Sequence, residues 1–305
     1  MDNISKVIEA IGIKLSAVEC RLNVSMKDYT SIKIGGVCRA MCFPQSTGEL
    51  TALCELLREC ATEYLIIGNG TNLIIDDRKP LEMIAVKTTK IDDISLVGGN
   101  EIKAGAGVAL SKLSEYACKC GLAGLEFAHG IPGTLGGAVS INAGAYGSEM
   151  KDVVISTTAY SHESGEYEIT GDEHGFSYRR SRFTDTPDIA LSSVLKLKKD
   201  DSENIRHRME ELSNRRRENQ PLDKPSAGST FKRPKEGYAA SLIEQAGLKG
   251  YISGGAQISP KHAGFIVNNG GATFADVMAI IDHVKITVFE QFGVDLEQEN
   301  KIIWK

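Results

Sequence analysis

Residues 121–147 read GLAGLEFAHGIPGTLGGAVSINAGAYG and carry eight glycines. Glycine weakens the interior of a helix or a strand, so this density favours a loop whose backbone lies close to a ligand. A glycine has no Cβ atom to keep an anion away from an unpaired backbone N–H group. The glycines placed to bind an anion in this way are Gly130, Gly133, Gly136 and Gly137. The segment therefore predicts a phosphate-binding loop, with a run of tight turns in a glycine-rich β protein as the alternative.

A second glycine turn lies earlier in the chain, in YLIIGNGTNLIID at residues 64–76. Apolar runs flank the polar turn on both sides, which predicts a strand, a phosphate-type loop and a second strand. The sixth position counted from Gly68 is Leu73 rather than glycine, and no Gly-Lys-Ser or Gly-Lys-Thr sequence occurs in the chain. The expected nucleotide site is therefore neither a Rossmann fingerprint nor a Walker loop.

Length and composition are those of an ordinary globular chain. Of the 305 residues, 42% are hydrophobic and 25% are charged, which is enough for two or three domains. The net charge of −5 argues against a nucleic-acid partner, and we interpret the basic run at 215–217 as a solvated helix face. No stretch reaches about 18 apolar residues, so we expect no membrane segment and a cytoplasmic protein.

Seven cysteines form an odd set, without a CxxC motif or histidines at zinc-like spacing. We interpret all of them as free thiols: Cys20, Cys38, Cys42, Cys54, Cys60, Cys118 and Cys120. No metal site is expected.

Hydrophobic spacing predicts helices and short strands without a regular βαβ repeat, and hence an α+β fold. Helices are expected from about Thr47, at 110–120, within 200–220, at 239–247, and after Thr273, where Asp276 suits the cap and Gly293 the stop. Strands are expected at 83–86, 94–97, 102–104, 153–160 and 189–197, with a short terminal strand within 296–303. We interpret the charged helix within 200–220 as the connection to another domain.

Three polar groups stand apart from the glycines. FSYRRSRF at 176–183 places three arginines between aromatics in a non-helical setting, where they would grip a carboxylate or phosphate, or form a basic surface loop. AGSTFKRP at 227–234 pairs Ser229 with two cations but lacks the G-x-S-x-G elbow of a hydrolase. Glu299, within LEQENKII at 296–303, is by itself an ordinary surface glutamate.

Taken together, seven segments resemble the UDP-N-acetylenolpyruvoylglucosamine reductase family from about Tyr29 to Ile303. They are YTSIKIGG (29–36), IIGNGTNLIIDD (66–77), GLEFAHGIPGTLGGAVSINAGAYG (124–147), YRRSRF (178–183), AGSTFKRP (227–234), GGAQISPKHAGFIVN (254–268) and LEQENKII (296–303). The resemblance implies an FAD enzyme that uses NADPH to reduce an enolpyruvyl nucleotide sugar in peptidoglycan precursor synthesis. The compact stretch 180–230 resembles the shorter subtype, which lacks an extra substrate-covering loop.

The resemblance also implies the fold and the cofactor site. An FAD-binding module of the vanillyl-alcohol-oxidase (PCMH) type is expected in two subdomains, 1–85 and 86–205, followed by a substrate-binding α+β domain at 206–305. The resemblance gives no reason to expect a covalent bond, so FAD is expected to be bound non-covalently; His129 is the only histidine or cysteine in the second glycine loop. The residues implied to bind FAD are Ile67, Gly68, Asn69, Gly70, Thr71, Asn72, Gly130, Ile131, Pro132, Gly133, Thr134, Gly136, Gly137, Asn142 and Gly144.

The family's catalytic residues fall on Arg179, Ser229 and Glu299. Arg179 would stabilise the negative charge that develops as hydride reaches C3 of the substrate, and Ser229 would protonate C2. Glu299 can help only as a neutral donor or through a hydrogen-bond network, since a second negative charge would oppose the step. Residues implied for the nucleotide sugar or NADPH are Tyr178, Lys232, Arg233, Lys261 and His262, with a structural role for His262 as an equal alternative. A monomer is expected.

Two other functions remain open from the sequence. Another flavin oxidase or dehydrogenase of the same cofactor fold, acting on an alcohol or sugar, would keep both glycine loops but would not need the Arg179, Ser229 and Glu299 set. A non-catalytic protein that binds a flavin or a nucleotide sugar would keep the loops without oxidising NADPH.

Overall fold

A computed structural model describes residues 3–304, and its internal contacts divide the chain into two compact units. Unit 1 comprises Met1–Leu22, Arg39–Asn69 and Glu82–Asn214; unit 2 comprises Asn23–Cys38, Gly70–Leu81 and Arg215–Lys305. One passage between the units, from Asn69 to Gly70, lies inside the first glycine loop. The expected division at 85/86 and 205/206 stays a prediction.

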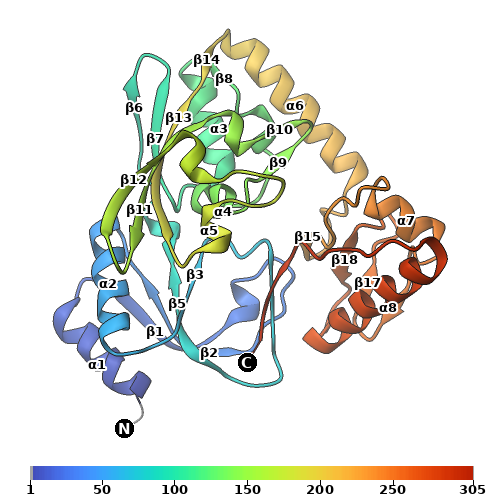
Figure 1. Ribbon diagram of the computed structural model, residues 1–305, viewed down its shortest axis with the longest axis horizontal. Helices are drawn as coiled ribbons and strands as arrows, with labels where there is room; N and C mark the ends of the chain where they lie inside the picture. The colour runs from blue at the N-terminus through green and yellow to red at the C-terminus, as the bar shows by residue number, and fades with distance from the viewer. Residues whose placement is uncertain (1–2, 305) are drawn as a thin grey trace. The chain divides into compact units, whose positions relative to one another are not determined.

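Unit 1 holds two sheets, covered by helices (Figure 1). Its helices are α1 (Asn3–Lys14), α2 (Thr47–Glu59), α3 (Leu110–Lys119), α4 (Leu135–Ser140) and α5 (Arg182–Asp185). One sheet has the order β1-β2-β5-β3, from β1 (Glu19–Ser25), β2 (Val37–Phe43), β3 (Tyr64–Ile67) and β5 (Leu81–Lys87), with some residues of β1, β2 and β5 in unit 2. The other has the order β12-β11-β13-β7-β6, from β6 (Ile94–Gly98), β7 (Glu101–Gly105), β11 (Val154–Ser161), β12 (Gly165–Thr170) and β13 (Ile189–Lys196).

Short elements complete the connections. Two strand pairs are β8 (Leu122–Ala123) with β14 (Lys198–Lys199) and β9 (Gly144–Ala145) with β10 (Ser148–Glu149). The 3₁₀ helices are η1 (Met26–Asp28), η2 (Thr88–Lys90), η3 (Glu126–Ala128), η4 (Met150–Asp152) and η5 (Gly171–His174).

The helix predicted from Thr47 shows how unit 1 closes over its first sheet. Ser46 accepts a hydrogen bond from the Glu49 backbone N (3.1 Å), which fixes the start of α2. The apolar face carries Leu50, Leu53 and Leu57, all fully buried in a cluster that includes sheet residues of β2 and β5. A second cluster lies under α3 and α4 and includes residues of β7 and β13. The glycine loops are thus carried by a packed scaffold.

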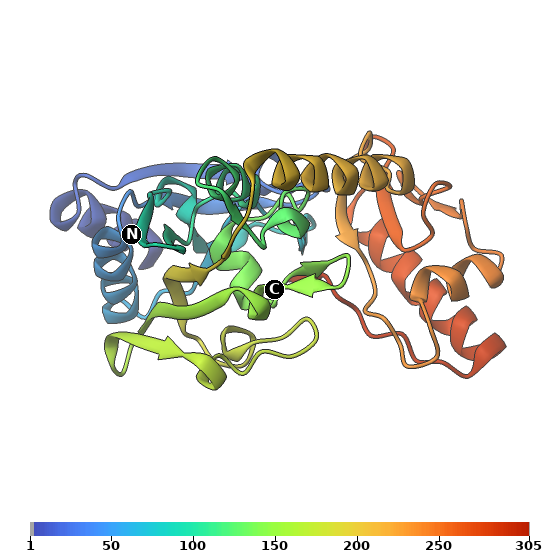
Figure 2. The same ribbon diagram turned by 90° about the horizontal axis from the view of Figure 1, so that it is seen from above.

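Unit 2 is an antiparallel sheet covered by a long helix. Its sheet has the order β15-β18-β17-β16, from β15 (Ser226–Ser229), β16 (Ile252–Ser253), β17 (Ala256–Ile258) and β18 (Phe265–Asn268). Its other elements are α7 (Ala239–Gln245), α8 (Phe274–Phe292) and the parallel pair β4 (Leu73–Ile75) with β19 (Lys301–Ile303). In both views α8 runs along β17 and β18 (Figures 1 and 2).

The predicted signals of α8 are confirmed. Thr273 and Asp276 form a reciprocal capping box at its start, and Gly293, with φ of 68°, ends it in the left-handed region. The charged helix expected within 200–220 is α6 (Ser202–Asn219), and the boundary between the two units falls inside it. Among residues 3–304, no helix is both long enough and apolar enough to cross a membrane.

The interpretation of all seven cysteines as free thiols is wrong. Cys20 on β1 and Cys42 on β2 form a disulfide, with Cα atoms 4.2 Å apart. Their strands are neighbours in the sheet, and this pairing cannot be deduced from a spacing of 22 residues along the chain. The other five cysteines form no disulfide within residues 3–304.

Asp76, directly after β4, generates a prediction about acid stability. Its side chain is 4% exposed and accepts hydrogen bonds from Nε (2.9 Å) and Nη2 (2.7 Å) of Arg78. Hydrogen bonding to Arg78 lowers the pKa of Asp76. A carboxyl whose folded-state pKa is depressed stabilises the fold above its unfolded pKa, and this contribution is lost as pH falls through the folded pKa.

We therefore predict that Asp76→Asn lowers the free energy of unfolding at pH 7 by about 1–2 kcal/mol. The difference from wild type should close as pH falls through the lowered folded-state pKa of Asp76, because the wild-type carboxyl then also becomes protonated. Urea unfolding between pH 2 and 8 measures both quantities. The exposed Asp223→Asn in the same unit is the control, and a deficit that does not change with pH would contradict the assignment.

Candidate functional site

The two glycine loops contact each other inside unit 1. Gly68 follows β3, and a Cβ atom added to it would overlap Oγ1 of Thr134, which precedes α4. The Asn69 side chain reaches the same loop, since its Nδ2 donates to the Pro132 carbonyl oxygen (2.9 Å). Two segments far apart in sequence therefore form one feature, the glycine cradle, defined here as Gly68, Asn69 and residues 130–137.

The glycine cradle gathers hydrogen-bond donors that have no acceptor in the protein. Within residues 3–304, the backbone N–H groups of Asn69, Gly130, Gly133 and Thr134 donate to no protein atom. Thr134 is 2% exposed, yet its hydroxyl does not cap α4. Backbone N–H groups gathered in one glycine-rich turn suit an anion with several oxygen acceptors. The residues present therefore fit the diphosphate of a dinucleotide.

The second loop is fixed by the scaffold beneath it. Gly136 donates its N–H to the Ala106 carbonyl (2.9 Å), and a Cβ on Gly136 would lie 2.8 Å from the Ala106 Cβ. The Leu110 backbone N donates to the Gly133 carbonyl (3.1 Å). Gly136 is thus required by close packing, whereas Gly137 is exposed on the same short helix.

Arg179 stands at the tip of a strained turn. The backbones of Ser177 and Arg180 pair across the turn (3.0 and 3.2 Å), and Arg179 has a φ of 54°, a region that a non-glycine residue seldom adopts. Its guanidinium donates to the Gly144 carbonyl (3.1 Å), and the buried Asn142 supports the turn by donating to the Ser177 carbonyl (3.0 Å). Strain of this kind is kept where a side chain has to be held in one place.

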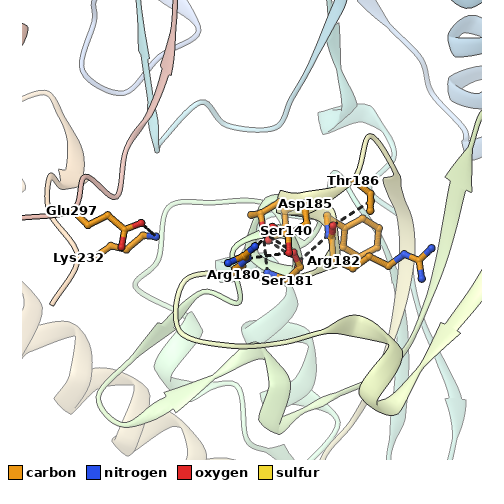
Figure 3. A network of polar contacts seen from close by, with 10 residues as sticks. Ser140, Arg180, Ser181, Arg182, Asp185, Thr186, Lys232 and Glu297 are labelled. Carbon is orange, nitrogen blue, oxygen red and sulfur yellow. Dashed lines mark hydrogen bonds and ion pairs between the residues drawn. The ribbon is translucent and has the colours of Figure 1, made fainter. Parts of the chain in front are cut away.

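The neighbouring arginines are engaged in the structure of unit 1 (Figure 3). Arg180 Nε lies 2.8 Å from Asp185, and Arg182 Nε lies 3.0 Å from Asp188. Ser181 donates to the Ser140 carbonyl (2.6 Å) and caps α5. The expected non-helical setting is therefore wrong for Arg182, because the Ser181 cap starts a short helix there.

In unit 2, the chain segments that carry Ser229 and Glu299 lie side by side. Ser229 ends β15, and the Glu299 backbone N donates to the carbonyl of Thr230 (2.8 Å). Two residues further along, the Lys232 backbone N donates to the Glu297 carbonyl (2.8 Å). The expected pair thus comes together through main-chain bonds between segments seventy positions apart, while Arg179 belongs to unit 1.

Asn300 joins these segments, and the sequence analysis did not single it out. It is 6% exposed, and its Nδ2 lies within hydrogen-bond distance of Asn72 Oδ1 (2.9 Å), the Ala227 carbonyl (2.7 Å) and the Ser229 carbonyl (3.3 Å). One buried amide therefore ties the first glycine loop to the Ser229 and Glu299 segments within unit 2. A lone asparagine beside Glu299 carries no periodic or spacing signal.

The residues expected to bind substrate make contacts of different kinds. Lys232 pairs with Glu297 (Figure 3), Arg233 stacks over the Tyr238 ring (4.4 Å), and Lys261 donates to a backbone carbonyl of α6. His262 Nδ1 accepts from the Gly264 backbone N (3.1 Å), its ring packs edge-on against Phe265, and burial lowers its pKa. These contacts favour the structural alternative for His262.

The remaining expected residues divide between the units by their place in the chain. Ile67, Ile131, Pro132 and Tyr178 lie in unit 1; Gly70, Thr71 and Asn72 lie in unit 2. Their contacts with a cofactor or substrate stay predictions.

Comparison with known proteins identifies two family matches. Residues 38–171 match a family described as FAD binding domain, and residues 220–303 match the UDP-N-acetylenolpyruvoylglucosamine reductase C-terminal domain. A UDP-N-acetylenolpyruvoylglucosamine reductase of Caldanaerobacter subterraneus is 47% identical over 92% of this chain and 93% of its own length. One from Pediococcus pentosaceus is 46% identical, over 91% and 92%.

A solved structure extends the likeness to the fold. The UDP-N-acetylenolpyruvylglucosamine reductase of Thermus caldophilus superimposes with a TM-score of 0.79 at 33% identity. The match covers 94% of this chain and 99% of that one. The α+β fold with an FAD-binding module is thereby confirmed.

Asn300→Ala tests the hydrogen bonds by which the Asn300 side chain connects segments of unit 2. The change leaves buried acceptors without a donor, so we predict a loss of about 2–3 kcal/mol in the free energy of unfolding. Asn269→Ala, an exposed position that also bonds a side-chain oxygen (2.8 Å to Gln257), should cost less than about 0.5 kcal/mol. Chemical denaturation measures both variants. Equal losses in the free energy of unfolding would show that the buried hydrogen bonds of Asn300 contribute no more than those of an exposed asparagine.

Proposed function

Since the chain belongs to the UDP-N-acetylenolpyruvoylglucosamine reductase family, we propose that it reduces UDP-N-acetylenolpyruvoylglucosamine to UDP-N-acetylmuramate, with FAD as cofactor and NADPH as the electron source. The observation that carries the proposal is the glycine cradle, where four backbone N–H groups find no acceptor in the described part of the protein. Neutral backbone amides suit a diphosphate, because their N–H groups can approach its oxygens closely.

Bound FAD supplies the hydride for the reaction. Residues 67–72 and the glycine cradle would hold its diphosphate. His129 supports non-covalent binding, because its Nδ1 lies 3.1 Å from the Ser213 hydroxyl and its Nε2 lies 3.3 Å from Glu115. Both ring nitrogens are thus engaged by unit 1 itself.

We assign the chemistry on the substrate to Arg179, Ser229 and Glu299. The enolpyruvyl double bond is electron-rich, so it accepts hydride at C3 only if the negative charge passing to the carboxylate is stabilised. The always-charged Arg179 meets this need, and its strained backbone is consistent with a fixed position. Ser229 would then donate a proton to C2, and Glu299 would assist as a neutral donor or through a hydrogen-bond network.

The substrate is an anionic nucleotide sugar, for which we propose contacts from Tyr178, Lys232, Arg233 and Lys261. Arg233 and Lys261 are exposed and positively charged, which suits contact with phosphate oxygens. We further propose that the protein is a monomer that acts in the cytoplasm.

Anaerobic absorbance spectroscopy tests the proposed function. The purified protein should show an oxidised flavin spectrum, which NADPH bleaches and the enolpyruvyl sugar restores. Bleaching without recovery would favour another flavin oxidase or dehydrogenase. Flavin that NADPH cannot reduce would favour a non-catalytic binding protein.

Ser229→Ala separates the two half-reactions. NADPH should still reduce the flavin at the wild-type rate, while reoxidation by the enolpyruvyl sugar should slow by about 10²–10⁴-fold, because the proton donor is missing. Stopped-flow absorbance measures each step. Ser226→Ala, on the same strand, is the matched control. Loss of both half-reactions in Ser229→Ala alone would refute the assignment.

A further inference from the structure

Lys87 stands at the edge of the glycine cradle, outside the motifs that mark the family. It is the last residue of β5 and pairs in parallel register with Ile67, the last residue of β3. From there its side chain reaches one residue past the ladder, and its Nζ donates to the Gly68 carbonyl (2.7 Å). The first residue of the cradle is therefore held from the β5 side by an ammonium group.

The bond between Lys87 and the Gly68 carbonyl also fixes the direction of the Asn69 N–H group. In a trans peptide, the C=O of one residue and the N–H of the next point in opposite directions. Because the Gly68 carbonyl points toward Lys87, the Asn69 N–H points away from it, and that N–H is one of the donors without a protein acceptor. Gly68 also lies close to Thr134, since a Cβ atom at position 68 would overlap Oγ1 of Thr134. The Lys87 bond therefore sets the orientation of a peptide that has little room for change.

The surroundings of Lys87 indicate why a charged side chain is found at this position. The side chain is half-buried, and desolvation lowers its pKa. A neutral side chain of the same length would avoid the penalty of burying a cation. The position instead carries an amine beside a loop that gathers donors for an anion, where a positive charge gains from the proximity of phosphate oxygens.

We infer that Lys87 is a positioning residue for the dinucleotide diphosphate: it orients the Gly68–Asn69 peptide so that the Asn69 N–H faces the anion, and it adds positive potential at the cradle. The inference rests on the proposed binding of FAD. A purely structural role, in which Lys87 only secures the edge of the sheet, would affect folding rather than cofactor affinity.

Two substitutions at Lys87 separate these roles. Lys87→Met keeps the length of the side chain but removes the donor and the charge, whereas Lys87→Arg keeps both. Lys90→Met removes a nearby lysine that pairs with Glu19 at the surface (2.8 Å) and serves as the matched control. The dissociation constant of FAD is measured on each holoenzyme by diluting it and following the fluorescence of the released flavin, and the thermal midpoint of each apoprotein is measured alongside.

We expect Lys87→Met to raise the dissociation constant by about 10- to 100-fold, as for the loss of a charged hydrogen bond. Lys87→Arg should recover most of the affinity, Lys90→Met should match wild type, and the apoprotein midpoints should agree. Wild-type affinity in Lys87→Met would overturn the inference. So would a lowered apoprotein midpoint in Lys87→Met together with no recovery in Lys87→Arg. Wild-type protein that takes up no FAD would instead overturn the proposed function, and this inference with it.

Discussion

The contact between Gly68 and Thr134 is the constraint on which the site depends. A side chain at position 68 would occupy the space of the Thr134 hydroxyl, so only glycine lets the loop after β3 approach the loop before α4 this closely. That approach places the Asn69 N–H and the Thr134 donors in one feature of unit 1. Because backbone geometry presents these donors, their arrangement is set by the fold before any ligand arrives, which limits the entropy lost on binding.

The chain uses different physical means for binding and for chemistry. The cradle relies on neutral amides, whereas the proposed catalytic groups are single side chains held by their neighbours. Strain and a guanidinium-to-carbonyl bond fix Arg179 in unit 1, and one buried amide, that of Asn300, joins the Ser229 and Glu299 segments in unit 2. Such support by adjoining residues is what keeps a reactive geometry rigid.

The sequence predicted features that depend on local physics. Glycine density marked both loops, and the Thr273 cap with the Gly293 stop marked α8, because each signal lies within a few neighbouring residues. Features that depend on the meeting of distant segments were missed. The Cys20 disulfide needs the order of strands, Asn300 needs three segments to meet, and the Lys87 bond needs the register of β3 against β5. The catalytic assignments came from the family resemblance and not from pattern.

The central claim is that both glycine loops form one cradle for FAD, and flavin titration of Gly68→Ala tests it most directly. The added methyl group must push the Thr134 loop away, so the account predicts that the variant folds but loses FAD affinity by at least about 100-fold, or about 2.7 kcal/mol. Gly12→Ala, a helical position with open space around it, should bind as wild type does. Tight FAD binding by Gly68→Ala would contradict the account.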